Sequence, residues 1–230
     1  MSKKTRHFTP TTFAFLRALA ENNNRDWFQA NKERYEEVVR EPALQFIRDF
    51  APHLQQISPF FQADDRKSGG SMFRIFRDIR FSKDKSPYKT HTGIQFRHVE
   101  GKDAHAPGFY LHLEPRRVFA GVGSWHPAGE ALAMIRDRIV KDPNGWKKAI
   151  TNRAFARNFE LTGESLKRPP RGYDPDHPLV TDLMRKDFIA VTQLTQKAVT
   201  SPEFLEEYAR SCRAGAPLME FLCRAVGAEY

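Results

Sequence analysis

The chain has 230 residues, of which 40% are hydrophobic and 28% charged, and it carries a formal net charge of +9. This length and apolar content suffice to bury one core, so we predict a single domain over residues 1–230, and the positive charge favours a polyanionic partner. No apolar run approaches the roughly 20 residues that a membrane-spanning helix needs, and the polar, basic N-terminus lacks a secretory h-region. These features exclude a membrane partner and favour a cytoplasmic location.

Helices are predicted in the first quarter of the chain. Thr9 followed by Pro10 fits a helix N-cap, and apolar residues then recur on one helical face. Asn24 is suited to cap a second helix, and Pro42 opens a third. Gly69-Gly70 then provides a flexible hinge into the next segment.

From residue 72 the sequence changes from helical periodicity to alternation. The alternation of apolar and polar side chains is clearest over residues 109–114. Similar segments at 93–99 and 117–125 predict a meander of antiparallel strands. Residues 72–81 are the predicted first strand, although their apolar residues also suit a helical stripe. We therefore predict an antiparallel sheet over about residues 72–125.

The C-terminal half returns to helices. One helix follows Pro127 and another starts at Pro143, whereas the Pro-rich basic stretch 167–174 cannot form regular structure. A helix near residues 179–184, an apolar run at 188–194 and two further helices complete the chain. Because helices precede and follow the sheet, the predicted fold class is α+β.

Two cysteines, Cys212 and Cys223, lie in the last helical part. So sparse a set of thiols in a cytosolic chain indicates buried, reduced side chains. We expect no disulfide.

The segment from Arg74 to Lys89 is rich in cations. Between Arg66 and His91 there are eight Lys or Arg residues against two Asp. Such a density of guanidinium and ammonium groups is typical of a carboxylate or phosphate site, because Arg can hold either anion through two parallel hydrogen bonds. Interleaved aromatic residues suit a base or sugar beside the phosphate. The predicted ligand-binding residues are Arg74, Arg77, Arg80, Lys83, Lys85, Tyr88 and Lys89, completed by Tyr110 and Trp125.

Two residues are predicted to carry a proton if the site is catalytic. His112 has the more suitable intrinsic pKa, and Asp78 lies within the basic segment. Asp78 is also near enough in sequence to orient a neighbouring guanidinium. Two alternatives stay open: Arg77 and Asp78 could form a structural ion pair, or the segment could be an ordinary solvated loop.

Four histidines recur at intervals of seven residues, namely His91, His98, His105 and His112. Intervening glycines and a proline exclude one continuous helix, so this spacing gives no common face. Of the combinations with other residues, His112, Glu114 and His126 form the only plausible ligand cluster. We expect no metal site and no cofactor.

Gly121 and Gly123 precede a predicted helix and could allow an anion to approach its N-terminus. The third glycine of a dinucleotide-binding fingerprint is missing, because His126 occupies that position. The pattern therefore favours a tight strand-to-helix turn.

The run from Arg74 to Thr90 resembles the signature of a bacterial family, domain of unknown function 2461. Four further segments are similar to this family: Asn22–Phe28, Phe109–His112, Trp125–Pro127 and Lys167–Asp174. The resemblance covers nearly the whole chain and implies a single domain of about this length. It brings no established activity.

Our hypothesis is that Arg77, Arg80, Lys85 and Lys89 hold an anionic, phosphate-bearing small molecule, with catalysis as an extension of binding. The first alternative is a nucleic-acid-binding module, which the second basic stretch at 167–171 also favours. The second alternative is a basic segment that serves only as a structural ion-pair network.

Overall fold

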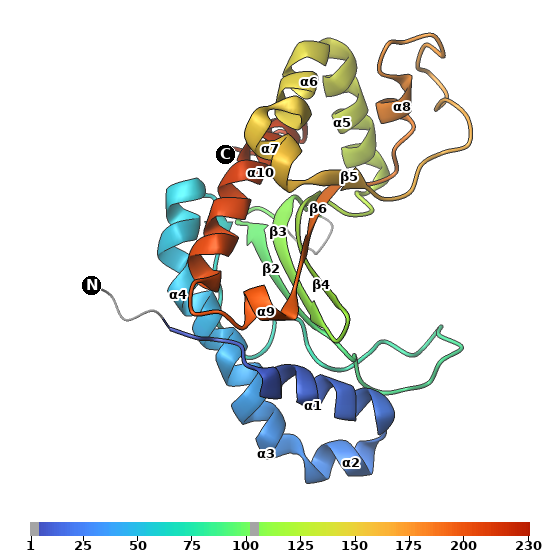
Figure 1. Ribbon diagram of the computed structural model, residues 1–230. Coiled ribbons are helices and arrows are strands. Elements are labelled where there is room, and N and C mark those ends of the chain that lie inside the picture. Colours follow the sequence, from blue (N-terminus) through green and yellow to red (C-terminus); the bar gives the residue numbers. More distant parts are fainter. Residues whose placement is uncertain (1–4, 102–105) are drawn as a thin grey trace.

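The computed structural model describes residues 5–101 and 106–230 and shows a twisted antiparallel sheet with helices α4 and α10 along one of its faces (Figure 1). The helices are α1 (Pro10–Glu21), α2 (Arg25–Ala30), α3 (Lys32–Tyr35), the π-helical η1 (Glu36–Arg40), α4 (Glu41–Ile57), α5 (Gly129–Lys141), α6 (Pro143–Thr151), α7 (Arg153–Asn158), α8 (Val180–Leu183), α9 (Gln196–Val199) and α10 (Phe204–Ala225). None of the helices among the described residues is long and apolar enough to cross a bilayer. His105 lies outside the described residues.

The strands are β1 (Phe61–Gln62), β2 (Thr92–His98), β3 (Gly108–Glu114), β4 (Arg117–Ser124), β5 (Glu160–Thr162) and β6 (Phe188–Leu194). Their order across the sheet is β1-β2-β3-β4-β6-β5, and every neighbouring pair is antiparallel. The predicted α+β class is confirmed.

Local sequence signals start the N-terminal helices where we predicted them. Pro10 is the first residue of α1, and the Thr9 N–H donates to Thr12 Oγ1 over 3.3 Å. Asn24 Oδ1 accepts the Trp27 N–H at 2.9 Å and so caps α2. These helix starts therefore follow from short-range chemistry.

Alternation along the strands places apolar side chains on the face that α4 and α10 cover. Ile94, Phe96 and Leu111 are fully buried there. The Phe96 ring centroid lies 4.7 Å from that of Phe50 on α4 and 6.2 Å from that of Tyr208 on α10. Burial of each such side chain contributes about 1.5–3 kcal/mol, so this face holds the core of the fold.

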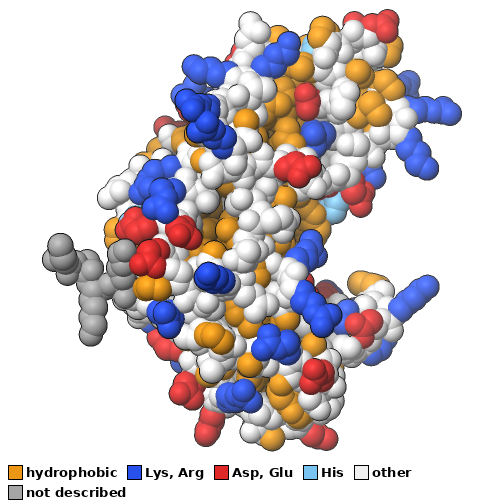
Figure 2. Space-filling model, in the orientation of Figure 1, with side chains coloured by type: hydrophobic (Ala, Val, Ile, Leu, Met, Phe, Trp, Pro, Cys, Tyr) orange, Lys and Arg blue, Asp and Glu red, His pale blue; other side chains and the backbone are white. Residues whose placement is uncertain are grey.

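The opposite face of the sheet, here called the outer face, carries Tyr110, His112 and Phe119. His112 lies opposite Gly93 of β2 on one side and opposite Phe119 of β4 on the other. Gln193 of β6 extends the same row. Figure 2 shows that the molecule is hollowed on this side. The outer face forms the inner wall of that hollow.

Two details of the predicted sheet differ from the structure. The apolar run at 188–194 is strand β6, which pairs with β4 and carries β5 at the sheet edge, so the sheet extends into the C-terminal half. The prediction of a strand over 72–81 is wrong. Only isolated bridges form there, from Met72 to Ile94 and from Phe76 to Tyr88.

The interpretation of Gly121 and Gly123 as a strand-to-helix turn is also wrong. Both residues lie inside β4, and α5 begins only at Gly129. Both glycines are therefore part of the sheet, and each lies opposite a residue of β6.

Cys212 and Cys223 are buried free thiols on α10, in agreement with the prediction. Burial raises the pKa of Cys223 to about 12 and also raises the pKa of Cys212. Because the thiolate is the reactive form of cysteine, both side chains are inert in the folded protein.

Candidate functional site

The cationic segment forms a long projecting loop, residues 73–91, here called the basic loop (Figure 1). Its two arms are joined by backbone hydrogen bonds, from the Arg77 N–H to the Pro87 carbonyl at 2.9 Å and from the Lys89 N–H to the Ile75 carbonyl at 2.7 Å. A regular strand is prevented because Pro has no N–H to donate and because Asp side chains at the tip bond their own backbone. The result is an irregular hairpin.

Tyr88 anchors the basic loop to the N-terminal helices. The Asn23 amide donates to the Tyr88 carbonyl at 2.9 Å and accepts the Tyr88 N–H at 3.1 Å. The Tyr88 ring is stacked on Phe28 of α2 at 4.1 Å between centroids and is 5% exposed. It lines a cavity of about 610 Å³ together with Arg25, Lys32, Phe76 and Arg77. Tyr88 therefore faces α2.

Most cations at the tip of the basic loop have partners within the loop itself. Arg80 donates to the two oxygens of Asp78 at 3.0 and 2.6 Å, and Arg77 pairs with Asp84. Lys85 Nζ donates to a backbone carbonyl at 2.9 Å. Asp78 thus orients Arg80, and for these arginines the pairing favours the structural interpretation. Hydrogen bonds from Arg80 lower the pKa of Asp78 to about 2, which makes Asp78 a weak general base.

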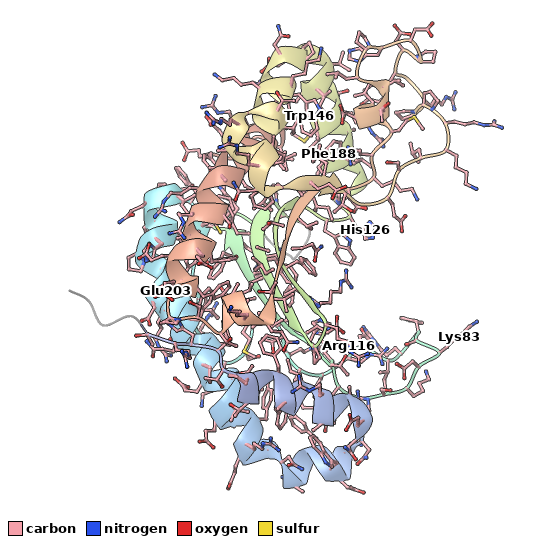
Figure 3. All side chains as sticks on the ribbon, viewed as in Figure 1. Lys83, Arg116, His126, Trp146, Phe188 and Glu203 are labelled. Carbon is pink, nitrogen blue, oxygen red and sulfur yellow. The ribbon has the colours of Figure 1, made fainter. Side chains whose placement is uncertain are left out.

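The tip itself points into solvent. Phe81 is 96% exposed, and Lys83 makes no hydrogen bond or ion pair with a described residue. Figure 3 shows Lys83 at the far end of the loop, away from the sheet. The tip residues do not join Tyr110 and His112.

Trp125 lies just beyond the end of β4, with 52% of its surface exposed and its ring 4.4 Å from that of His126. The His126 N–H donates to Asp187 Oδ1 at 2.8 Å, and His126 Nδ1 lies 3.0 Å from the same oxygen. Figure 3 shows His126 and Lys83 on opposite sides of the hollow. His126 therefore pairs with Asp187, and the histidine that lies with His112 and Glu114 is His91.

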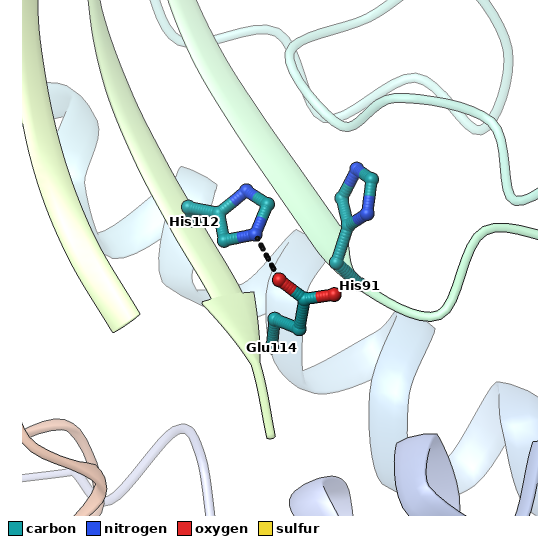
Figure 4. Close-up of side chains that lie close together, drawn as sticks. All are labelled: His91, His112 and Glu114. Carbon is teal, nitrogen blue, oxygen red and sulfur yellow. Dashed lines mark hydrogen bonds and ion pairs between the residues drawn. The ribbon is translucent and has the colours of Figure 1, made fainter. Parts of the chain in front are cut away.

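A different group of side chains meets on the outer face, here called the histidine cluster: His91, Tyr110, His112 and Glu114. The Tyr110 hydroxyl lies 3.0 Å from His112 Nδ1, and His112 Nε2 lies 3.2 Å from Glu114 Oε2. The His112 ring is stacked between those of His91 and Phe119, at 4.5 and 4.7 Å. Figure 4 shows His91, His112 and Glu114 gathered at one place on the sheet.

Strand register explains how this cluster forms. Tyr110, His112 and Glu114 alternate with apolar residues along β3 and so share the outer face. His91 immediately precedes β2. Gly93, two residues further along the chain, lies opposite His112. A Cβ at residue 93 would lie 2.7 Å from the Tyr110 hydroxyl oxygen, so this glycine leaves room for the tyrosine.

Burial sets the protonation states in the cluster. It lowers the pKa of His91 to about 4, and it also lowers the pKa of His112. Burial raises the pKa of Tyr110. At pH 7 both imidazoles are therefore neutral and the tyrosine keeps its proton. Because a carboxylate only accepts, His112 Nε2–H donates to Glu114 and His112 Nδ1 accepts from the Tyr110 hydroxyl, whereas neither nitrogen of His91 makes a hydrogen bond with a described residue.

Three cations border the histidine cluster. Lys89 Nζ donates to the Arg74 carbonyl at 2.8 Å, and burial, followed by the charge of Arg74, lowers the pKa of Lys89. The Arg117 guanidinium lies 5.2 Å from the Phe119 ring centroid. Within the described residues, the side chains of Arg74 and Arg117 make no hydrogen bond or ion pair. These two arginines therefore make no direct ion pair with a described residue, although Glu114 lies opposite Arg117 in the strand register and the charge of Arg74 helps to lower the pKa of Asp78.

The structure divides the predicted site residues into separate groups. Lys89, Tyr110 and His112 come together on the outer face, and the charge of Arg74 lies near both Lys89 and Asp78. The other predicted residues lie elsewhere: Arg77, Asp78, Arg80, Lys83 and Lys85 in the outer part of the basic loop, Tyr88 against α2, and Trp125 beyond the far end of β4.

Sequence reasoning missed His91, Arg117 and Asp187. His91 was noticed in the seven-residue series, but only strand register brings it to His112. Arg117 is the first residue of β4 and lies at the edge of the cluster. A charged residue at the start of a strand is the sequence signal for it. Asp187 directly precedes the apolar run of β6, so an acid bordering a buried strand was its signal.

Comparison with known proteins identifies the family of the chain. No curated protein matches it. A family model described as a conserved hypothetical protein (DUF2461) matches residues 11–221 of the 230. The match includes the basic loop, the histidine cluster and the segment around His126. The chain therefore belongs to the DUF2461 family.

Proposed function

We propose that the protein binds an anionic, phosphate-bearing small molecule over the outer face, held by Arg74, Lys89 and Arg117 above Tyr110 and His112. In Figure 2, Lys and Arg side chains gather at the rim of the hollow on this side. The proton-carrying role of His112 stays a prediction. The proposed location is the cytoplasm, where phosphorylated metabolites occur and where thiols stay reduced.

The environment of Lys89 carries this proposal. Its ammonium is half-buried, yet no carboxylate among the described residues pairs with it, and its one hydrogen bond goes to a carbonyl. Cations that leave water are normally paired with an acid, because desolvation of an isolated charge is costly. Here the nearby charge is a second cation, Arg74. A phosphate would relieve that repulsion and accept hydrogen bonds from both groups.

Lys89→Met is expected to weaken binding of inorganic pyrophosphate at least 10-fold, since a hydrogen bond to a charged group contributes about 1.5–3 kcal/mol. Isothermal titration calorimetry in low-salt buffer measures the affinity, and inorganic phosphate serves as the smaller probe. The melting temperature of the free protein should stay unchanged or rise, because Lys89 is a desolvated cation without an acid.

Lys83→Met is the matched control for this experiment. It removes the same charge from the same loop, but at the exposed tip, and should change pyrophosphate affinity less than 2-fold. Equal losses in the two variants would contradict a site on the outer face. A lower melting temperature in Lys89→Met without any change in affinity would assign Lys89 a structural role.

Single-stranded nucleic acid is a second candidate ligand, favoured by the exposed tip of the basic loop. Phe81 is 96% exposed; Arg80, which is paired with Asp78, precedes it, and Lys83 follows two residues later. An aromatic ring between cations suits stacking on a base while the neighbours contact phosphate. This surface differs from the outer face, so the two candidates can be separated by mutation.

If nucleic acid binds at the tip, Phe81→Ala is expected to weaken binding of a fluorescent single-stranded oligonucleotide by about 10-fold or more, because stacking contributes about 1–3 kcal/mol per base. Fluorescence anisotropy measures this effect. The logarithm of the binding constant should fall steeply with the logarithm of salt concentration. A flat salt dependence, or an unaltered affinity in Phe81→Ala, would reject this candidate.

A further inference from the structure

We propose that His91, His112 and Glu114 bind a divalent transition metal ion of the zinc class on the outer face. One donor atom from each residue lies within 4.8 Å of the other two. In a tetrahedral site with metal–donor distances of about 2.0–2.2 Å, donors lie about 3.3–3.5 Å apart. His112 Nε2 and Glu114 Oε2 lie 3.2 Å apart, slightly closer than that spacing. The His91 nitrogen lies within 4.8 Å of both other donors.

The surroundings of His112 orient it as a ligand. Its ring is fixed by stacking between His91 and Phe119. The Tyr110 hydroxyl lies 3.0 Å from Nδ1. In the structure Nε2–H donates to Glu114 and Nδ1 accepts from the tyrosine hydroxyl. A metal ion that replaces the proton on Nε2 shifts that proton to Nδ1, which then donates to the tyrosine oxygen. A hydrogen-bond partner on the second ring nitrogen is the usual means by which proteins fix the tautomer of a metal-binding histidine.

His91 gives an independent indication of a missing partner. Its ring is half-buried, and neither of its nitrogens makes a hydrogen bond with a described residue. Its ring contact is with His112, face to face at 4.5 Å and 30°. Two imidazoles stacked beside a carboxylate gain little from one another, whereas a shared cation would bind all three.

The donor types decide the class of metal. Imidazole nitrogens favour zinc and its transition-metal neighbours, whereas magnesium and calcium prefer oxygen ligands throughout. Two histidines and one glutamate leave a coordination position free, as in catalytic rather than structural zinc sites. Glu114 and His91 are partly exposed, so solvent can reach that position. The inference does not depend on anion binding.

The test uses the full-length protein stripped with a chelator and dialysed into phosphate-free buffer. Calorimetric titration with Zn²⁺ should show saturable binding of one equivalent, and Co²⁺ should give visible absorption bands of a low-symmetry, four- or five-coordinate ion. His91→Ala and Glu114→Gln should each weaken Zn²⁺ binding by roughly 100-fold, and Tyr110→Phe by about 10-fold. Glu114→Gln keeps an oxygen that accepts a hydrogen bond from His112. It therefore tests the carboxylate as a metal ligand while the packing of the cluster is preserved.

His126→Asn is the matched control, because it removes another imidazole that lies 3.0 Å from a carboxylate oxygen, that of Asp187. Asn tolerates the positive φ of 45° at this position. The Zn²⁺ affinity of this variant should equal that of the wild type. The proposal is overturned if the wild type shows no saturable binding, or if His91→Ala and Glu114→Gln bind Zn²⁺ as tightly as it does.

Discussion

Replacement of Gly123 by Ala is expected to destabilise the protein by about 4 kcal/mol or more, at the upper end of single-substitution effects. Gly123 lies in β4 with a φ of 125°, a conformation that residues with a side chain rarely adopt. A Cβ there would lie 2.0 Å from the Phe188 carbonyl oxygen and 2.9 Å from Ile189 Cα. Both atoms belong to the β6 backbone, so the clash cannot be relieved by rotation of a side chain. β4 and β6 would have to separate.

Urea unfolding followed by circular dichroism measures this loss. In thermal melts the transition should fall by about 10 °C or more, since 1 kcal/mol shifts a chain of this size by about 2–4 °C. Gly121→Ala is the matched control in the same strand, because a Cβ at that residue has no neighbour closer than 3.8 Å. Its stability should stay within about 0.5 kcal/mol of the wild type. Similar melting of the two variants would show that the close approach of β6 at Gly123 is tolerated.

The parts of the fold that could be predicted from sequence are those that short-range chemistry determines. Thr9 and Asn24 start helices because each accepts a free N–H of the first turn: the Thr9 carbonyl accepts the Thr12 N–H, and Asn24 Oδ1 accepts the Trp27 N–H. The alternation over 109–114 predicts β3 because one face of the sheet is covered and the other is not. Neither feature depends on a distant part of the chain.

The parts that could not be predicted depend on contacts between distant segments. Residues 72–81 contain enough apolar residues for a strand, but Asn23, 65 residues from Tyr88, holds the returning arm of the loop by its backbone. The apolar run at 188–194 was seen, yet its pairing with β4 brings together residues about 70 positions apart, such as Val118 and Leu194. Periodicity alone does not specify the partner of a strand.

The candidate site shows the same limit at the level of side chains. The charge of the basic segment is evident from the sequence, but whether each cation is neutralised depends on geometry. Arg80 has Asp78, whereas Lys89 has no acid partner among the described residues and lies near the charge of Arg74. His91 and His112 are 21 residues apart and meet only because β2 and β3 pair in one register. A shift of one residue would move His112 to the core face.

Replacement of Asp187 by Ala is expected to cost about 3–4 kcal/mol, because two partly buried N–H groups would lose their acceptor at about 1–3 kcal/mol each. Asp187 is 1% exposed and accepts the His126 N–H and the Glu164 N–H, each at 2.8 Å. It thereby fixes the segment after β4, where His126 has a positive φ, to the segment after β5. Loss of the carboxylate frees both segments at one side of the hollow. Chemical unfolding measures the cost, and amide hydrogen exchange should accelerate most at His126 and Glu164.

Glu164→Ala provides the matched comparison, since it removes a carboxylate from the same segment. The Glu164 side chain is 64% exposed, and its ion pair with Lys186, at 3.1 Å, is open to solvent. Such pairs contribute about 0–1 kcal/mol, so this variant should unfold close to the wild type. Equal stability of Asp187→Ala and Glu164→Ala would mean that water replaces the buried carboxylate as acceptor. Zn²⁺ affinity should survive in both variants, because β3 and the residue before β2, which carry the histidine cluster, make none of these hydrogen bonds.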